Sequence, residues 1–198
     1  MLSTLRRQTA TGLRLLIVLT VVCGIVYPLA VWGVSRLPGL SLSAEGSAEG
    51  SSVIGVDPVA ADPAADPFFH TRPAASAAGV LGPADTTTSG GSNEAGDSTD
   101  LLDAVAQRRA AVAAREGVAP AAVPTDAVTA SASGLDPDIS PAYAALQAAR
   151  VARVTGLPDA QVRALVDRAT DGRTIGFLGE PTVDVTELNL AVQQAAGR

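Results

Sequence analysis

Residues 15–34 form the longest stretch of the chain without a charged residue, and they constrain the fold more than any other segment. At about 1.5 Å of rise per residue, a helix of this length spans about 30 Å, the thickness of the hydrocarbon layer of a bilayer. Arg14 and Arg36 stand at its two ends. A core helix of a soluble protein rarely runs so far without a charge, so the sequence predicts a single transmembrane helix at residues 15–34.

The charges on either side of this segment predict its orientation. Arg6, Arg7 and Arg14 precede it, whereas the first acidic residue of the chain is Glu45. Positive charge close to a span is retained on the cytoplasmic side. We therefore expect a single-pass protein of the plasma membrane, with residues 1–14 in the cytoplasm and the C-terminal domain outside.

Two other interpretations of the apolar segment fit less well. A cleaved signal peptide has a shorter apolar core, and the nearest small-x-small site, at residues 41–43, lies well beyond this one. A lipoprotein site at Cys23 would need a small residue where Val22 stands. Trp32 is typical of an anchor at the membrane surface. Cys23 is also the only cysteine, so no disulfide framework is expected, and it should face lipid or a partner helix.

The part of the chain that follows the span is acidic. The formal net charge is −6, all 20 acidic residues follow the span, and the chain contains no lysine. This charge argues against nucleic acid and anionic lipid headgroups as partners. It does not by itself make a cation site.

Helices and short strands alternate after the span, which predicts an α+β fold: one N-terminal transmembrane helix followed by a single small extracytoplasmic domain. Residues 35–66 read as a linker with a first strand at residues 53–56, and residues 67–198 as the domain, with a flexible loop at residues 79–99. Phe68 and Phe69 should pack into the core. Helices are expected at residues 100–116, at residues 141–154 with Ser140 as the cap, and in two segments that begin at residues 158 and 186. In the first of these helices Leu102 should lie on the buried face and Arg108, Arg109 and Arg115 on the other. Strands are expected at residues 128–131, 174–178 and 182–185.

The residues needed for the usual catalytic and metal sites are missing. One histidine and one membrane-embedded cysteine cannot make a zinc site or a Cys/His pair, and without lysine there is no phosphate-binding loop of the Walker type. His70 is expected to pack or donate a hydrogen bond. Residues 89–93 are either a nest of backbone N–H groups for an anion or a surface turn. The residues alone thus indicate a tethered domain without catalysis.

From residue 123 onward the sequence resembles the C subunit of the Kdp potassium-transporting ATPase, the KdpC family. The resemblance rests on Val123-Pro124-x-Asp126, on Ser131-x-Ser133-Gly134-Leu135-Asp136-Pro137-x-Ile139-Ser140-Pro141, on Gln147 and Arg150-Val151-Ala152, on Gly179-Glu180-Pro181 and on Glu187-Leu188-Asn189. Upstream, Phe69, Arg72-Pro73 and Ser89-Gly90-Gly91-Ser92-Asn93 match in order behind a single span. The chain departs from the family at Asp138, where His is usual, at Asp184, where Asn is usual, and at Glu94-Ala95-Gly96, where Leu-Gly-Pro is usual.

The resemblance implies an accessory subunit of an ATP-driven potassium uptake complex. Its partners would be a channel-like subunit that conducts K⁺ and a P-type ATPase subunit, whose ATP affinity this subunit raises while it stabilises the assembly. ATP and K⁺ would be handled by the complex, with no cofactor bound tightly to this chain. A direct ATP contact has been argued for the family from residues 89–93, but the charge asymmetry places these residues outside. We therefore expect any effect on ATP binding to pass through the span.

The resemblance also selects the residues that contact partners or brace the domain. They are Arg72, Ser89, Gly90, Gly91, Ser92, Asn93, Ser131, Ser133, Gly134, Asp136, Ser140, Gln147, Arg150, Glu187 and Asn189. In the span, Gly24, Pro28 and Gly33 suit close packing against other helices, although such residues are common in membrane helices generally. The alternative function is a stand-alone membrane-tethered binding or cell-envelope domain. A tethered hydrolase fits less well, because no nucleophile and base pair stands out.

Overall fold

The computed structural model describes residues 2–37, 65–85 and 87–197 and divides the chain into two units. The first unit contains one long helix, and the second contains a small domain of helices and a three-stranded sheet. This arrangement confirms the α+β prediction. The expected strand at residues 53–56 lies outside the described residues.

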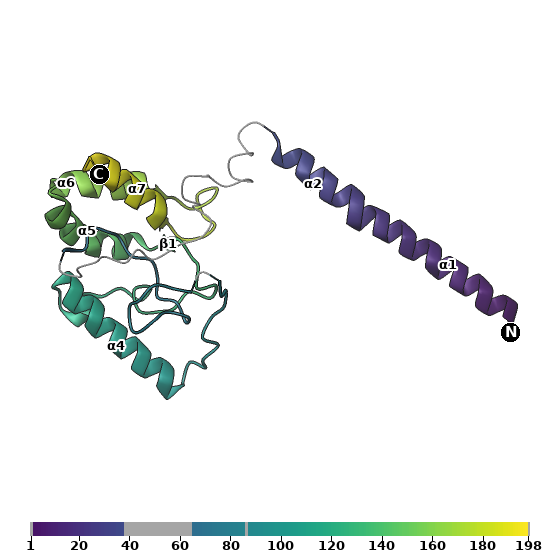
Figure 1. Cartoon of the computed structure of the whole chain (residues 1–198), viewed down its shortest axis with the longest axis horizontal. Coiled ribbons are helices and arrows are strands. Elements are labelled where there is room, and N and C mark those ends of the chain that lie inside the picture. Colours follow the sequence, from purple (N-terminus) through teal and green to yellow (C-terminus); the bar gives the residue numbers. More distant parts are fainter. Residues whose placement is uncertain (1, 38–64, 86, 198) are drawn as a thin grey trace. The chain divides into compact units, whose positions relative to one another are not determined.

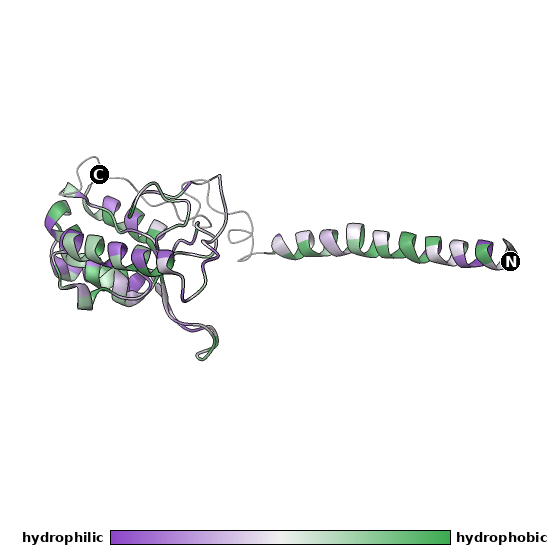
Figure 2. Cartoon of the chain, turned by 90° about the horizontal axis from the view of Figure 1, so that it is seen from below, coloured by the Kyte–Doolittle hydropathy of each residue, from purple (hydrophilic) through white to green (hydrophobic). Residues whose placement is uncertain are grey.

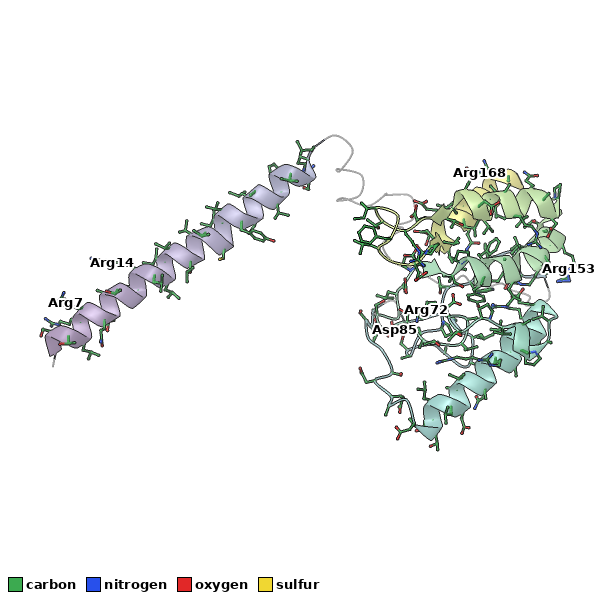
Figure 3. All side chains as sticks on the ribbon, turned by 180° about the vertical axis from the view of Figure 1, so that it is seen from behind. Arg7, Arg14, Arg72, Asp85, Arg153 and Arg168 are labelled. Carbon is green, nitrogen blue, oxygen red and sulfur yellow. The ribbon has the colours of Figure 1, made fainter. Side chains whose placement is uncertain are left out.

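The N-terminal helix runs as α1 (Leu2–Val21), a π-helical turn (Val22–Val26) and α2 (Tyr27–Ser35). Residues 3–35 are long and apolar enough to cross a membrane, and they are the only such helix among the described residues. The side chains of residues 3–34 are all exposed in the isolated chain, and the apolar ones among them form a surface of the kind that lipid or protein covers. Hydrophilic residues gather near the N-terminal end of the helix, where Arg7 and Arg14 lie (Figures 2 and 3).

The π-helical turn has a local cause in the sequence. Pro28 has no N–H to donate to the carbonyl of Gly24, and its ring crowds that carbonyl. The chain responds with a wider turn, in which the N–H of Tyr27 donates to the carbonyl of Val22. At the C-terminal end of the helix, the Arg36 guanidinium lies 5.2 Å from the centre of the Trp32 ring, which is a cation–π contact.

The domain is built around α5 (Pro141–Thr155), which packs against α4 (Thr99–Glu116) on one side and α6 (Asp159–Arg168) on the other. Figure 1 shows α5 in the middle, with α4 below and α6 and α7 (Val185–Ala195) above. A short 3-10 turn (Pro120–Ala122) follows α4. The core combines Phe69 with apolar side chains from all four helices and from the loops, including Val128, Tyr143, Val162 and Leu188.

The sheet is small and antiparallel, in the order β1-β3-β2. Strand β1 (Asp138–Ile139) pairs with β3 (Thr182–Asp184) so that Asp138 faces Asp184, and β2 (Thr170–Asp171) pairs with the same strand. The predicted strand at residues 182–185 is thus confirmed, one residue shorter.

Two predicted strands are wrong. Residues 128–131 form turns, because the carbonyl of Thr125 accepts the N–H groups of both Val128 and Thr129. Residues 174–178 form a tight turn closed by a single bridge between Thr174 and Leu178. In both segments β-branched and apolar residues favoured a strand, but local hydrogen bonds determined the conformation, and in the second segment Gly176 adds a residue in the left-handed region.

The predicted helices are confirmed, with shifts of one or two residues at their ends. The expected faces of α4 are wrong in part: Leu102 is 57% exposed, whereas Arg108 and Arg109 are half-buried and donate to the carbonyls of Val128 and Val123. The reason is that α4 buries residues Val112 and Ala113 near its C-terminal end, so its first turns extend beyond the core.

Candidate functional site

Two side-chain amides hold residues 69 and 70 in the middle of the domain. The N–H of Phe69 donates to Oδ1 of Asn189 at 2.8 Å, and Nδ2 of Asn189 donates back to the carbonyl of Phe69 at 2.9 Å. Gln147 does the same for His70, at 2.8 and 3.1 Å. The two amides thus replace the neighbouring strands of a sheet on either side of an extended segment, and they satisfy four backbone groups that the core removes from water.

Arg150 lies at the centre of a set of buried charges, with only 3% of its surface exposed. Its Nε donates to both carboxylate oxygens of Glu116 at 3.1 and 3.0 Å, and Nη2 donates to Oε1 of Gln147 at 3.1 Å. Nη1 donates to the carbonyls of Asp66 and Phe68 at 2.8 and 2.9 Å. We call Asp66, His70, Glu116, Gln147 and Arg150 the buried polar cluster. It ties the segment that enters the domain to α4 and α5.

The carboxylate of Asp66 closes this cluster. It contacts the His70 ring and lies 3.5 Å from Nη1 of Arg150. Burial raises the pKa of Asp66, but the hydrogen bond and charge of His70, the N–H of Phe68 and the charge of Arg150 together outweigh it, so the pKa is lowered. Asp66 is therefore held as an anion inside the fold. His70 has the packing and hydrogen-bonding role that the sequence predicted.

A second cluster joins the loops around residues 72, 90 and 131–136, and we call it the loop junction. Nη1 of Arg72 donates to Asp136 at 3.3 Å, and Nη2 donates to the carbonyls of Thr129 and Ala130 at 3.4 and 3.2 Å. The N–H of Ser131 donates to the carbonyl of Pro73 at 2.8 Å. Figure 3 shows Arg72 among these loops. Arg72 thus binds the segment at residues 129–136, which is more than fifty residues away in the chain.

The glycine-rich segment at residues 89–93 is part of the same junction. The N–H of Gly90 donates to the carbonyl of Ser133 at 2.8 Å. A Cβ built on Gly91 would stand 3.2 Å from the carbonyl oxygen of Ala132, so the two loops cross closely at a glycine. Ser89, Ser92 and Asn93 are exposed. Because the N–H of Gly90 is already used, this arrangement favours the surface turn over the anion nest.

The other polar residues of the motif organise turns and helix ends. Ser140 caps α5 through the N–H of Tyr143 at 3.0 Å, and Asp126 accepts both the N–H and the hydroxyl of Ser140 at 2.7 and 3.0 Å. The hydroxyl of Ser131 accepts the N–H of Gly134 at 3.1 Å. Further turn and cap bonds link Ser133 to the N–H of Leu135, Asp136 to that of Asp138, and Asp184 to that of Glu187. These bonds are those of structural braces.

Four acidic residues gather around the sheet. Asp138 lies opposite Asp184 in the β1–β3 pairing. Burial and the nearby charges of Asp136, Asp184 and Asp171 all raise the pKa of Asp138. Two of these positions, Asp138 and Asp184, are among those at which the chain departs from the family pattern.

The structure therefore brings most of the motif residues together in two places, the buried polar cluster and the loop junction. Glu187 is exposed on α7, and Gly24, Pro28 and Gly33 lie in the separate N-terminal helix. Asp66 and Glu116 are members of the buried polar cluster that the sequence analysis missed. A signal for Glu116 existed: an acidic residue at a helix C-terminus is unfavourable for the helix dipole, which indicates a cationic partner. Among the described residues no group of three potential metal ligands occurs.

These features define a class of protein: a small α+β domain, braced by buried polar side chains, joined to one helix that is long and apolar enough to anchor it in a membrane. Residues 9–194 match the family model described as KdpC, the K⁺-transporting ATPase c chain. The chain is 50% identical to the potassium-transporting ATPase KdpC subunit of Kineococcus radiotolerans, over 98% of this chain and 97% of that protein. It is 44% identical to that of Streptomyces avermitilis, over 92% and 91%, and 43% identical to that of Mycobacterium tuberculosis, over 96% and 100%.

The chain belongs to the KdpC family. The resemblance noted in its motifs is thereby confirmed over nearly the whole length.

Proposed function

We propose that the chain is the accessory, non-catalytic subunit of an ATP-driven, high-affinity potassium uptake complex. The observation that carries the proposal is the match to relatives named KdpC subunits over nearly their full length. The polar residues of the motif support the absence of catalysis in this chain, because Arg72, Gln147 and Arg150 are occupied by contacts within the fold. A bracing role leaves chemistry and ion conduction to other subunits.

The partners we propose are a channel-like potassium-transporting subunit and a P-type ATPase subunit. The N-terminal helix is the part best suited to bind them within the membrane. A Cβ atom at Gly24 or Gly33 would meet nothing within 4 Å, and without one a partner helix can approach the backbone closely there. The π-helical turn that contains Gly24 adds a local widening of a kind often found at functional positions.

We further propose that the chain raises the ATP affinity of the ATPase subunit indirectly. With the N-terminus in the cytoplasm and the domain outside, the domain and ATP are on opposite sides of the membrane. The coupling then passes through the span to the partner subunits, as a difference in how tightly the chain binds two states of the complex.

Affinity purification from native membranes tests the assembly. A tagged copy of the chain should bring down two multi-span membrane proteins. Gly24→Leu with Gly33→Leu should reduce their recovery, whereas Val18→Leu with Val31→Leu, at equally exposed positions of the helix, should not. If the chain is recovered alone, and if it stays stable when residues 15–34 are replaced by leucine, it is instead a stand-alone tethered domain.

Cysteine labelling tests the orientation independently. In a Cys23→Ser background, Ser92→Cys introduces one exposed thiol in the domain. A reagent that cannot cross the cytoplasmic membrane should label this thiol in cells in which that membrane is intact. Labelling only after lysis of the inner membrane would contradict the proposed orientation, and with it the indirect route to ATP.

A further inference from the structure

The loop between β2 and β3 carries an apolar tip that the fold does not bury. Residues 171–180 are all exposed, and the loop is the yellow-green segment that leaves the helices before α7 in Figure 1. At its tip Ile175, Phe177 and Leu178 are 73%, 68% and 52% exposed. Three large apolar side chains at the end of one loop are unfavourable in water, so something outside the domain has to compensate for them.

The backbone of this tip is unusual as well. Ile175 has φ 48°, in the left-handed region that a β-branched residue rarely adopts, and Gly176 follows at φ 84°. A turn that served only to connect two strands would have Gly, Asn or Asp in place of Ile175. The strained conformation and the exposed side chain at the same residue indicate that the side chain itself is required.

The tip is also closed and neutral. The N–H groups of Thr174 and Leu178 donate to each other's carbonyls at 2.9 and 3.0 Å, and that of Gly176 donates to the carbonyl of Arg173 at 3.0 Å. Residues 174–179 carry no charge, and behind them Arg173 pairs with Glu180 at 2.6 Å. Backbone groups that bond within the turn and a charge pair behind it are what entry into an apolar medium requires.

We propose that Ile175, Phe177 and Leu178 insert into the outer part of the bilayer in which the N-terminal helix is anchored. The same chain keeps the domain close to that surface, which raises the effective concentration of the tip at the membrane. The contact is hydrophobic, because the domain is acidic and would be repelled by anionic headgroups. A second attachment point would restrict rotation of the domain about its tether. This inference needs only the membrane anchor and stands whether or not the chain joins a transport complex.

A single tryptophan placed at the tip tests the insertion. The full-length chain contains one tryptophan, Trp32. The variant Trp32→Phe with Phe177→Trp therefore reports on the tip alone, and Trp32→Phe with Leu102→Trp, at an exposed position of α4, is the matched control. Both are reconstituted without other proteins in phosphatidylcholine vesicles and compared with vesicles that contain brominated phosphatidylcholine.

We expect the emission of the tip tryptophan to shift to the blue and to be quenched by bromine, while the control tryptophan keeps the emission of a solvated indole. The quenching should persist in high salt and be lost when Ile175→Asp is added. A tip tryptophan that stays solvated, or that shifts without bromine quenching, would overturn the proposal. Burial that appears only when other subunits are reconstituted with the chain would identify a protein contact instead and would equally overturn it.

Discussion

The side-chain amide of Gln147 hydrogen-bonds both backbone polar groups of His70 and is itself completely buried. Asn189 binds the preceding residue, Phe69, in the same way. Successive residues of an extended segment direct their N–H and C=O groups to opposite sides. The segment is thus held between α5 and α7 as a strand is held in a sheet, with two side chains in place of two strands.

The first prediction concerns this pairing. Gln147→Met keeps the length of the side chain but removes the amide that binds the N–H and C=O of His70 in the core. Each of the two backbone groups that loses this hydrogen bond costs about 1–3 kcal/mol, so the free energy of unfolding should fall by about 2–6 kcal/mol. Chemical denaturation of the full chain in detergent, followed by circular dichroism, measures the change. Gln194→Met, at an exposed position of α7, is the control; equal stability of the two variants would contradict the structural role.

The second prediction concerns the buried charges. Arg150→Met removes the guanidinium that joins the carboxylates of Glu116 and Asp66, which leaves Glu116 with Arg115 and Asp66 with His70. Removal of one partner from a buried pair costs up to about 3–5 kcal/mol. The domain should unfold at a much lower denaturant concentration or fail to fold. Arg153→Met, one turn away on the exposed side of α5, should have little effect.

A double substitution separates the charge from the volume of the side chain. If the loss in Arg150→Met comes from the buried carboxylate of Glu116, which then has Arg115 as its remaining cation, addition of Glu116→Gln should recover part of the stability. Strictly additive losses would show that the contribution of Arg150 does not depend on Glu116 and comes from its other contacts.

Local signals were enough to predict the helices of this fold. Ser140 followed by Pro141 marks the start of α5, and Gly117 and Gly156 in the left-handed conformation mark the ends of α4 and α5. The strands were harder because each pairs over only two or three residues, too few for an alternating pattern. β2 was not predicted, because it covers only Thr170 and Asp171.

The candidate site was predictable in its members but not in its geometry. The motif selected Arg150 and Asn189 among others, yet their partners are distant in the chain: Asp66 is 84 residues from Arg150, and Phe69 is 120 residues from Asn189. Contacts over such separations depend on how the helices pack, which a single sequence does not specify. Asp66 and Glu116 lie in an apparent linker and on an apparent helix surface, so their burial was visible only in the folded chain.

The third prediction compares two adjacent glycines at the loop junction. A Cβ on Gly91 would stand 3.2 Å from the carbonyl oxygen of Ala132, whereas one on Gly90 would meet nothing within 4 Å. Gly91→Ala should therefore lower the free energy of unfolding by about 1 kcal/mol or more, the cost of overpacking, and expose residues 89–93 to protease. Gly90→Ala should resist the protease like the unchanged chain. The opposite ranking would show that the two loops do not cross as described.

The last prediction concerns the pH dependence of stability at the sheet. Because burial and the charges of Asp136, Asp184 and Asp171 raise the pKa of Asp138, the folded state favours its protonated form. The contribution of this residue to stability is present below the ordinary pKa of an aspartate, about 3.9, and is lost as the pH rises through the raised value. Asp138→Asn should therefore stabilise the chain at pH 7 and not at pH 3. The gain should stay below about 1 kcal/mol, since solvent screens a partly exposed carboxylate.

Thermal unfolding of the full chain at the two pH values measures this difference. Asp138→Glu keeps the charge and should keep the pH dependence of the unchanged chain, which separates the loss of charge from the change of shape. An Asn variant that is less stable than the unchanged chain at pH 7 would mean that the Asp138 carboxylate makes a favourable contact there. In that case the repulsion among the four acidic residues would not control the stability of the β1–β3 pair.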